Sequence, residues 1–114
     1  MSQFLALMNY LHRVVGNRPA YVAGFRGGYP GLVYFVADLN PAPYTVELHT
    51  MVFTTQQRRA YMATFQKEVL PHTQALLTSS LTGREARIFL DRYPHARRIT
   101  VMFAGAPYYV LLAN

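Results

Sequence analysis

Histidines are the residues of this chain best suited to acid–base or metal chemistry, and there are four of them. They are His12, His49, His72 and His95, and no two are three or four residues apart, so no pair on one helical turn can begin a zinc site. Cysteine is absent, which excludes disulfides, thiolate metal ligands and a cysteine nucleophile. No serine or threonine has the sequence context of a nucleophile elbow. We therefore expect surface or interface histidines, no metal or cofactor, and no catalytic activity.

A glycine-rich segment, residues 24–31, is the second feature that could bind a ligand. Its glycines would let backbone amides approach a phosphate closely, and Arg26 could pair with that phosphate. A phosphate loop, however, leads into a helix whose N-terminus faces the anion. Here an apolar run typical of a strand follows, and neither the dinucleotide nor the P-loop spacing is present. We interpret the segment as a hairpin turn.

Arginine is the strongest sign of a partner in the sequence. Ten arginines and one lysine against five acids give a net charge of +6, and such a balance favours phosphate-rich partners or an anionic surface. The arginines lie in two predicted helices and before a predicted strand, and would form one stripe if the helices share a face of the sheet. The predicted contact residues, including two tyrosines that could stack on bases, are Arg58, Arg59, Arg84, Arg87, Arg97, Arg98, Tyr108 and Tyr109. A purely compositional origin of the arginines is an equal alternative.

Composition favours one kind of partner over the other. The chain is 52% hydrophobic and only 14% charged, whereas about a quarter of the residues in a soluble domain are charged. Apolar surface is therefore expected to remain for a partner to cover. Arginine and tyrosine are enriched at protein interfaces, and the aromatic RNA-binding motifs are absent from the sequence. These features favour a protein interface over direct contact with RNA or DNA.

Three helices are predicted to position these residues. Residues 2–15 have apolar side chains at three- and four-residue spacing, which indicates an amphipathic helix. Residues 54–70 repeat the pattern, and Pro71 ends or kinks that helix. We interpret residues 72–80 as its weaker continuation and residues 82–93 as the third helix.

Five strands are predicted from apolar runs bounded by glycine and proline. The first three form a β-meander and the last two a hairpin, and they span residues 20–25, 32–37, 44–53, 99–103 and 108–112. The element order is thus α-β-β-β-α-α-β-β. We expect a single α+β domain over residues 1–114, with an antiparallel sheet covered on one face by helices.

The N-terminal segment bears on localisation. The first 37 residues contain Arg13, Arg18 and Arg26 but no acid, which is typical of a mitochondrial targeting helix. We expect this helix to be retained uncleaved in a mitochondrial protein, with the cytoplasm as the other location. No window reaches the roughly 18 uninterrupted apolar residues of a membrane span, so we expect no transmembrane segment.

Three functional hypotheses follow. The leading one is a non-catalytic structural or interaction subunit of a larger assembly, with other protein subunits as partners. Respiratory-chain, ATP synthase and ribosome complexes of mitochondria are the assemblies we consider, including a place at the periphery of a membrane complex. The alternative is a basic RNA- or DNA-binding module that uses the arginine stripe and tyrosine stacking. The third is an enzyme that acts on an anionic substrate near Arg26 and a histidine.

Overall fold

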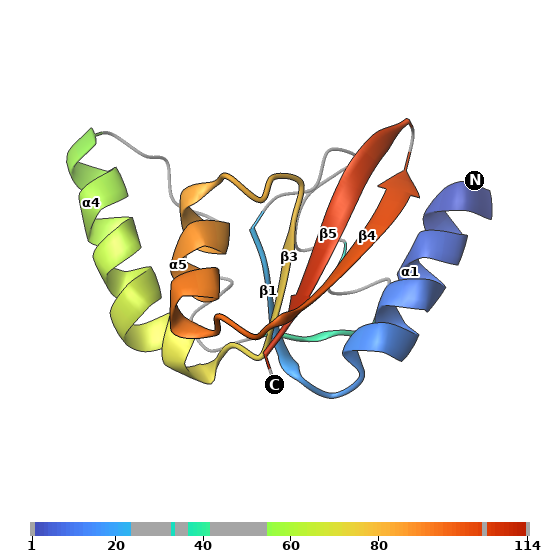
Figure 1. Ribbon diagram of the computed structural model, residues 1–114, viewed down its shortest axis with the longest axis horizontal. Coiled ribbons are helices and arrows are strands. Elements are labelled where there is room, and N and C mark those ends of the chain that lie inside the picture. Colours follow the sequence, from blue (N-terminus) through green and yellow to red (C-terminus); the bar gives the residue numbers. More distant parts are fainter. Residues whose placement is uncertain (1, 24–32, 34–36, 42–54, 104, 114) are drawn as a thin grey trace.

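The computed structural model describes residues 2–23, 33, 37–41, 55–103 and 105–113. In these residues a mixed five-stranded sheet combines with helices, which confirms the predicted α+β class. Figure 1 shows the sheet with α1 (Ser2–Val15) on one side and α4 (Thr55–Thr64) and α5 (Arg84–Arg92) on the other. The elements are α1 (Ser2–Val15), β1 (Pro19–Val22), β2 (Asn40–Pro41), α4 (Thr55–Thr64), η1 (Phe65–Val69), η2 (Leu70–His72), β3 (Ala75–Thr78), α5 (Arg84–Arg92), β4 (Arg97–Phe103) and β5 (Ala106–Leu112).

The strands are ordered β2-β1-β3-β5-β4 across the sheet. β1 pairs in parallel with both β2 and β3, and Ala20 lies opposite Pro41 on one side and Ala75 on the other. β5 pairs antiparallel with β3 and with β4, and the β4–β5 hairpin closes at the pair Phe103 and Ala106. The C-terminal strand β5 therefore lies inside the sheet, and β4 lies at an edge.

α1 covers one face of the sheet through the apolar side of its helix, as its sequence predicts. Leu7, Met8, Leu11 and Val15 recur at helical spacing, and all four are buried. Gly16 ends the helix with a φ of 61°, a conformation that favours glycine, and its N–H donates to the carbonyl of His12 at 3.0 Å. The strand residues in the same core are Ala20, Val22, Ala75, Leu77, Tyr108, Val110 and Leu112.

α4, its continuation and α5 cover the other face. α4 widens into the π-helix η1, whose Phe65 and Val69 are buried, and then tightens into the 3₁₀-helix η2 with Pro71 in its first turn. Proline removes a helical hydrogen bond, so the helix ends here as predicted. The buried Thr73 hydroxyl donates to the carbonyl of Val69 at 2.8 Å. The second core comprises Tyr21, Phe65, Val69, Leu70, Leu76, Ala86, Phe89 and Leu111.

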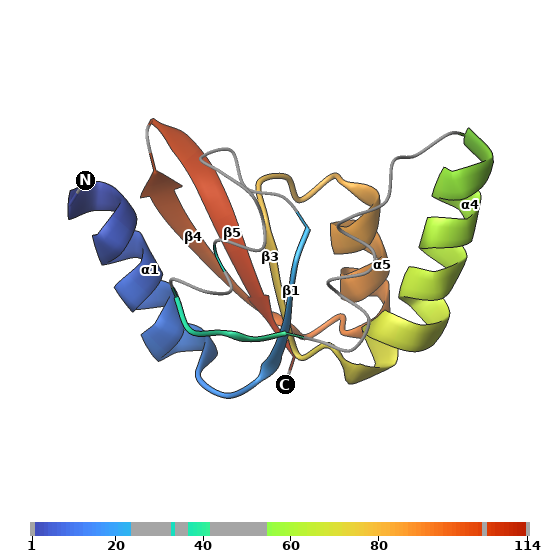
Figure 2. The same ribbon diagram turned by 180° about the vertical axis from the view of Figure 1, so that it is seen from behind.

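The expected antiparallel sheet with helices on one face is wrong in two respects. β1 makes parallel pairs, and helices lie on both faces, as Figure 2 also shows from behind. All four residues of β3 are buried. A strand that is apolar on both sides needs cover on both sides, and α1 and α5 provide it.

The predicted helical continuation over residues 72–80 is also wrong. Ala75–Thr78 forms the strand β3 at the centre of the sheet. A short apolar run has no periodicity that separates a buried strand from a buried helix turn. Its tertiary pairing with β1 and β5 decides the conformation.

Much of the predicted meander lies outside the described residues. This holds for the turn over residues 24–31 and for the strand over residues 44–53. Within the predicted strand 32–37, Val33 is helical and its carbonyl accepts a hydrogen bond from the N–H of Ala37 at 3.0 Å. That described position is not extended, contrary to the prediction.

Candidate interaction surfaces

The edge strand β4 has one packed face and one open face. Ile99, Val101 and Phe103 are partly buried and pack on the α1 side of the sheet. Arg98, Thr100 and Met102 alternate with them on the opposite face, and all three are exposed. Met102 is 67% exposed. The described residues of the core beneath α4 and α5 include none from β4, so this part of the sheet has an open apolar and basic face.

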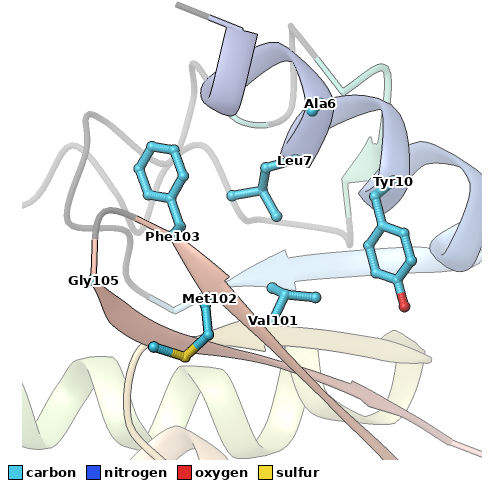
Figure 3. Close-up of a pocket in the computed structure, with 7 residues that line it drawn as sticks. All are labelled: Ala6, Leu7, Tyr10, Val101, Met102, Phe103 and Gly105. Atoms are coloured by element: carbon cyan, nitrogen blue, oxygen red, sulfur yellow. The ribbon is translucent and has the colours of Figure 1, made fainter.

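A groove runs between α1 and the β4–β5 hairpin. Its volume is about 460 Å³, and its described lining residues are Ala6, Leu7, Tyr10, Val101, Met102, Phe103 and Gly105. Figure 3 shows Leu7 and Phe103 on facing elements, with Tyr10 farther along α1 and the side chain of Met102 directed away from α1. The rings of Phe4 and Phe103 meet edge to face with centroids 6.3 Å apart. We call this feature the α1–β4 groove; its walls are mainly apolar.

The backbone of β4 presents hydrogen-bonding groups at the sheet edge. The N–H of Ala113 donates to the carbonyl of Gln74 at 2.9 Å, so odd-numbered residues of this segment direct their backbone groups toward β3. Pro107 fits this pattern. It lies opposite Met102, and as an odd-numbered residue it would not donate to β4, so its missing N–H costs no hydrogen bond between β4 and β5. The partners of these odd-numbered residues in β4 are Arg98, Thr100 and Met102. Their N–H and C=O groups therefore point away from β5, toward an edge at which no other strand of the described chain pairs with β4. We call this side of β4 the free edge.

The predicted arginine stripe is only partly assembled. α4 and α5 lie on the same face and start at the same end of the molecule in both views, which brings the first turns of the two helices to one side (Figures 1 and 2). Arg84 and Arg87 line one groove of about 300 Å³ between the helices, with Met62, Ile88 and Asp91. The carboxylate of Asp91 in this groove offsets part of the arginines' charge.

The remaining predicted contact residues are dispersed. Arg59 is exposed on α4, and the side chain of Arg58 lies outside the described part of the chain. Arg97 and Arg98 are both exposed but, as neighbours in a strand, lie on opposite faces of the sheet. Tyr109 is partly buried on the face of Arg98. Tyr108 is 3% exposed in the core under α1, so it presents little surface to a partner.

A tyrosine pair under α4 was missed by sequence reasoning. The hydroxyls of Tyr21 and Tyr61 are 2.5 Å apart and share a hydrogen bond. Burial raises the pKa of Tyr61 to about 12, and the Glu85 carboxylate acts in the same direction while the bond to Tyr21 opposes it. Burial likewise raises the pKa of Glu85. With its pKa at about 12, the Tyr61 hydroxyl keeps its proton at pH 7, so it is poorly suited to act as a base and contributes to the core through its hydrogen bond. The sequence did contain a signal for this pair. Tyr61 lies four residues before Phe65 on the apolar side of its helix, and a buried tyrosine hydroxyl needs a hydrogen-bond partner.

Three of the four histidines lie in the described part of the chain. His12, His72 and His95 are exposed, as expected, and His49 lies outside the described residues. A ring nitrogen of His12 hydrogen-bonds to the carbonyl of Ala37 at 2.9 Å. Within the described chain, no group of three or more histidine or acidic side chains is arranged to hold a metal ion.

By its architecture, the chain is an α+β domain with β4 at one edge of a mixed sheet. Comparisons of the chain with protein-family models, with curated proteins and with solved structures found no match. Among the described helices, none has both the length and the apolar character required to cross a membrane. A proposal for the function therefore rests on the surfaces of this chain.

Proposed function

We propose that this chain is a non-catalytic interaction subunit that binds a partner protein through β4 and the α1–β4 groove. The observation that carries the proposal is the free edge of β4 next to a groove of about 460 Å³ with mainly apolar walls. Unpaired edges and exposed apolar surface are costly to leave open to water and to other chains. A partner that covers both at once removes both liabilities.

A mitochondrial assembly is the setting that the proposal favours. The basic, acid-free N-terminal segment is its basis. α1 buries Leu7, Met8, Leu11 and Val15 against the sheet, and its removal would expose that core. This packing supports the expectation that the helix is retained rather than cleaved.

The test is the size of the native particle that contains the chain. Lysate of cells that make the chain is fractionated on a density gradient, with and without nuclease. We expect the chain in a large particle that survives nuclease. Met102→Glu should shift most of the chain out of that particle, because it places a charge on the apolar part of the edge. Gln66→Glu, the same charge change at an exposed position outside β4, is the matched control.

Migration of the wild-type chain near its own mass of 13.0 kDa would overturn the proposal. If the same fraction of the Met102→Glu and Gln66→Glu chains is found in the large particle, the partner binds elsewhere.

The alternative function is a nucleic-acid-binding module, and one observation favours it. Arg84 and Arg87 line a common groove near the basic start of α4. This alternative requires that the particle collapses on nuclease treatment. It also requires that affinity for single-stranded nucleic acid falls as salt is added. For each phosphate contact, the logarithm of the binding constant should fall by roughly 0.7 for every tenfold rise in salt concentration. The Asp91 carboxylate in the same groove and the opposite faces of Arg97 and Arg98 are the reasons that we place this function second.

A further inference from the structure

The free edge of β4 and the groove beside it together indicate what kind of partner segment fits, an inference that rests on the proposed function. We propose that β4 binds an extended segment of a partner protein as an additional strand of the sheet. In this segment, apolar side chains alternate with acidic ones. The apolar side chains enter the α1–β4 groove, and the acidic side chains lie on the face of Arg98.

The backbone of β4 supplies the binding ladder. Arg98, Thr100 and Met102 each direct an N–H and a C=O away from β5. Alternate residues of an edge strand are the ones that pair with an added strand. Exposed side chains at all three positions leave the edge accessible. An added strand of about six residues would match the length of this ladder.

The α1 side of the edge selects apolar side chains. Leu7 of α1 and Val101 and Phe103 of β4 line the α1–β4 groove (Figure 3). The volume of about 460 Å³ lies in the range of about 300–1,000 Å³ that is usual for ligand sites. Every second side chain of an added strand points to this face. Apolar residues at those positions would be removed from water there.

The opposite side selects acidic side chains. Arg98 lies on that face at the start of the ladder and is exposed. Its own strand β4 and the neighbouring strand β5 contain no aspartate or glutamate, and the acids of α5 on this face, Glu85 and Asp91, belong to a helix that contributes no contact with β4 to the core. A partner segment with carboxylates on this face is therefore complementary in charge. A second copy of the chain fits less well, because it has the same net charge of +6.

The test uses the full chain and a synthetic peptide, acetyl-(Val-Glu)₄-amide, in an NMR titration of backbone amides. We expect the largest shifts at Arg98, Thr100 and Met102. The charge-reversed peptide acetyl-(Val-Lys)₄-amide should bind at least tenfold more weakly, because its cations face Arg98.

Thr100→Pro is the decisive variant, and Thr100→Val is its matched control. The N–H of Thr100 points outward, so proline removes a donor to the ligand without removing one from the β4–β5 ladder. We expect at least a tenfold loss of peptide affinity in Thr100→Pro and little change in Thr100→Val. If Thr100→Pro does not fold, Arg98→Glu replaces it and should reverse the preference between the two peptides.

Wild-type affinity in a folded Thr100→Pro variant, an unreversed preference in Arg98→Glu, or shifts confined to α4 and α5 would each overturn this inference. So would a dimer of the chain that Thr100→Pro dissociates, because the occupant would then be a second copy. If Thr100→Pro stays in the large native particle, the strand-addition inference fails while the proposed function stands. If the wild-type chain is in no particle, the proposed function itself fails.

Discussion

Tyr61 shows how a single buried side chain makes the stability of this fold depend on pH. Its hydroxyl shares a hydrogen bond with that of Tyr21, and burial raises its pKa to about 12 from an ordinary value of 10.0. The folded state therefore holds the phenolic proton over a pH range in which the unfolded chain has lost it. Ionisation of Tyr61 must then work against folding.

We predict that the free energy of unfolding falls by about 2 kcal/mol between about pH 10 and pH 12 because of Tyr61. This stability is fully present below pH 10, the unfolded pKa, and is lost as the pH rises toward the folded pKa of about 12. Urea denaturation at a series of pH values measures it. Tyr61→Phe is the control, and its stability should fall less over the same range. Parallel curves for the two proteins would contradict the prediction.

At the scale of elements, the end of α1 depends on one backbone conformation. Gly16 has a φ of 61°, and the nearest atom to a Cβ built there is a nitrogen of Arg18 at 3.9 Å. There is room for a methyl group, so any cost of substitution comes from the backbone. Arg18 also donates to the carbonyls of Val14 and Val15 at 3.2 and 3.1 Å, which satisfies groups at the helix end.

We predict that Gly16→Ala lowers the free energy of unfolding by about 1 kcal/mol, because a residue with a Cβ is strained at positive φ. Gly16→Asn should cost less, since asparagine tolerates this conformation better. Gln66→Ala, at an exposed helical position, is the control and should stay within about 0.5 kcal/mol of wild type. Thermal or urea denaturation compares the three variants, and equal stability of the two alanine variants would refute the argument.

Elements with a clear local pattern were predictable from sequence. α1 was predicted because its apolar residues repeat at helical spacing, and its bounds, Ser2–Val15, match the prediction. The C-terminal hairpin was predicted from two apolar runs around Gly105, and β4 and β5 confirm it. The third helix was predicted over residues 82–93, whereas α5 begins at Arg84 after the N-cap Gly83 and ends at Arg92.

Features that depend on distant partners were not predictable. Nothing in residues 75–78 signals a strand until β1 and β5 lie on either side of it. The parallel direction of β1 depends on connections between distant segments and leaves no local pattern. In the candidate site, the described arginines among the predicted contact residues are exposed. The apolar wall from α1 and the outward-pointing backbone groups of β4 could not be predicted, because they follow from the register of the sheet. A strand pattern alone does not identify an edge.

At the scale of the whole molecule, two cores share one sheet. Leu11 is fully buried on the α1 face and Phe89 is fully buried on the α5 face. β1, β3 and β5 contribute alternate residues to both cores. The two sides of the protein are therefore coupled through the same backbone ladder.

We predict that Leu11→Ala and Phe89→Ala each destabilise the whole fold, by about 2–5 and 3–5 kcal/mol respectively. Unfolding should remain a single transition, with the same midpoint by circular dichroism of the backbone and by tyrosine fluorescence. Met102→Ala, at a 67% exposed position, is the control and should stay within about 0.5 kcal/mol of wild type. Separate transitions for the two probes would show that the two cores unfold independently.

The position of β5 inside the sheet also has a consequence for how the chain reaches this fold. Ala75 of β3 pairs with Leu112, and Arg97 of β4 pairs with the same residue, so both strands complete their pairing only after β5 has been synthesised. Pairings between residues so distant in sequence make folding slow relative to that of helical bundles. Until the ribosome has added residues as far as Leu112, β3 and β4 have exposed edges and α1 has an incomplete surface to cover. The nascent chain is thus most prone to aggregation just before its synthesis reaches this strand.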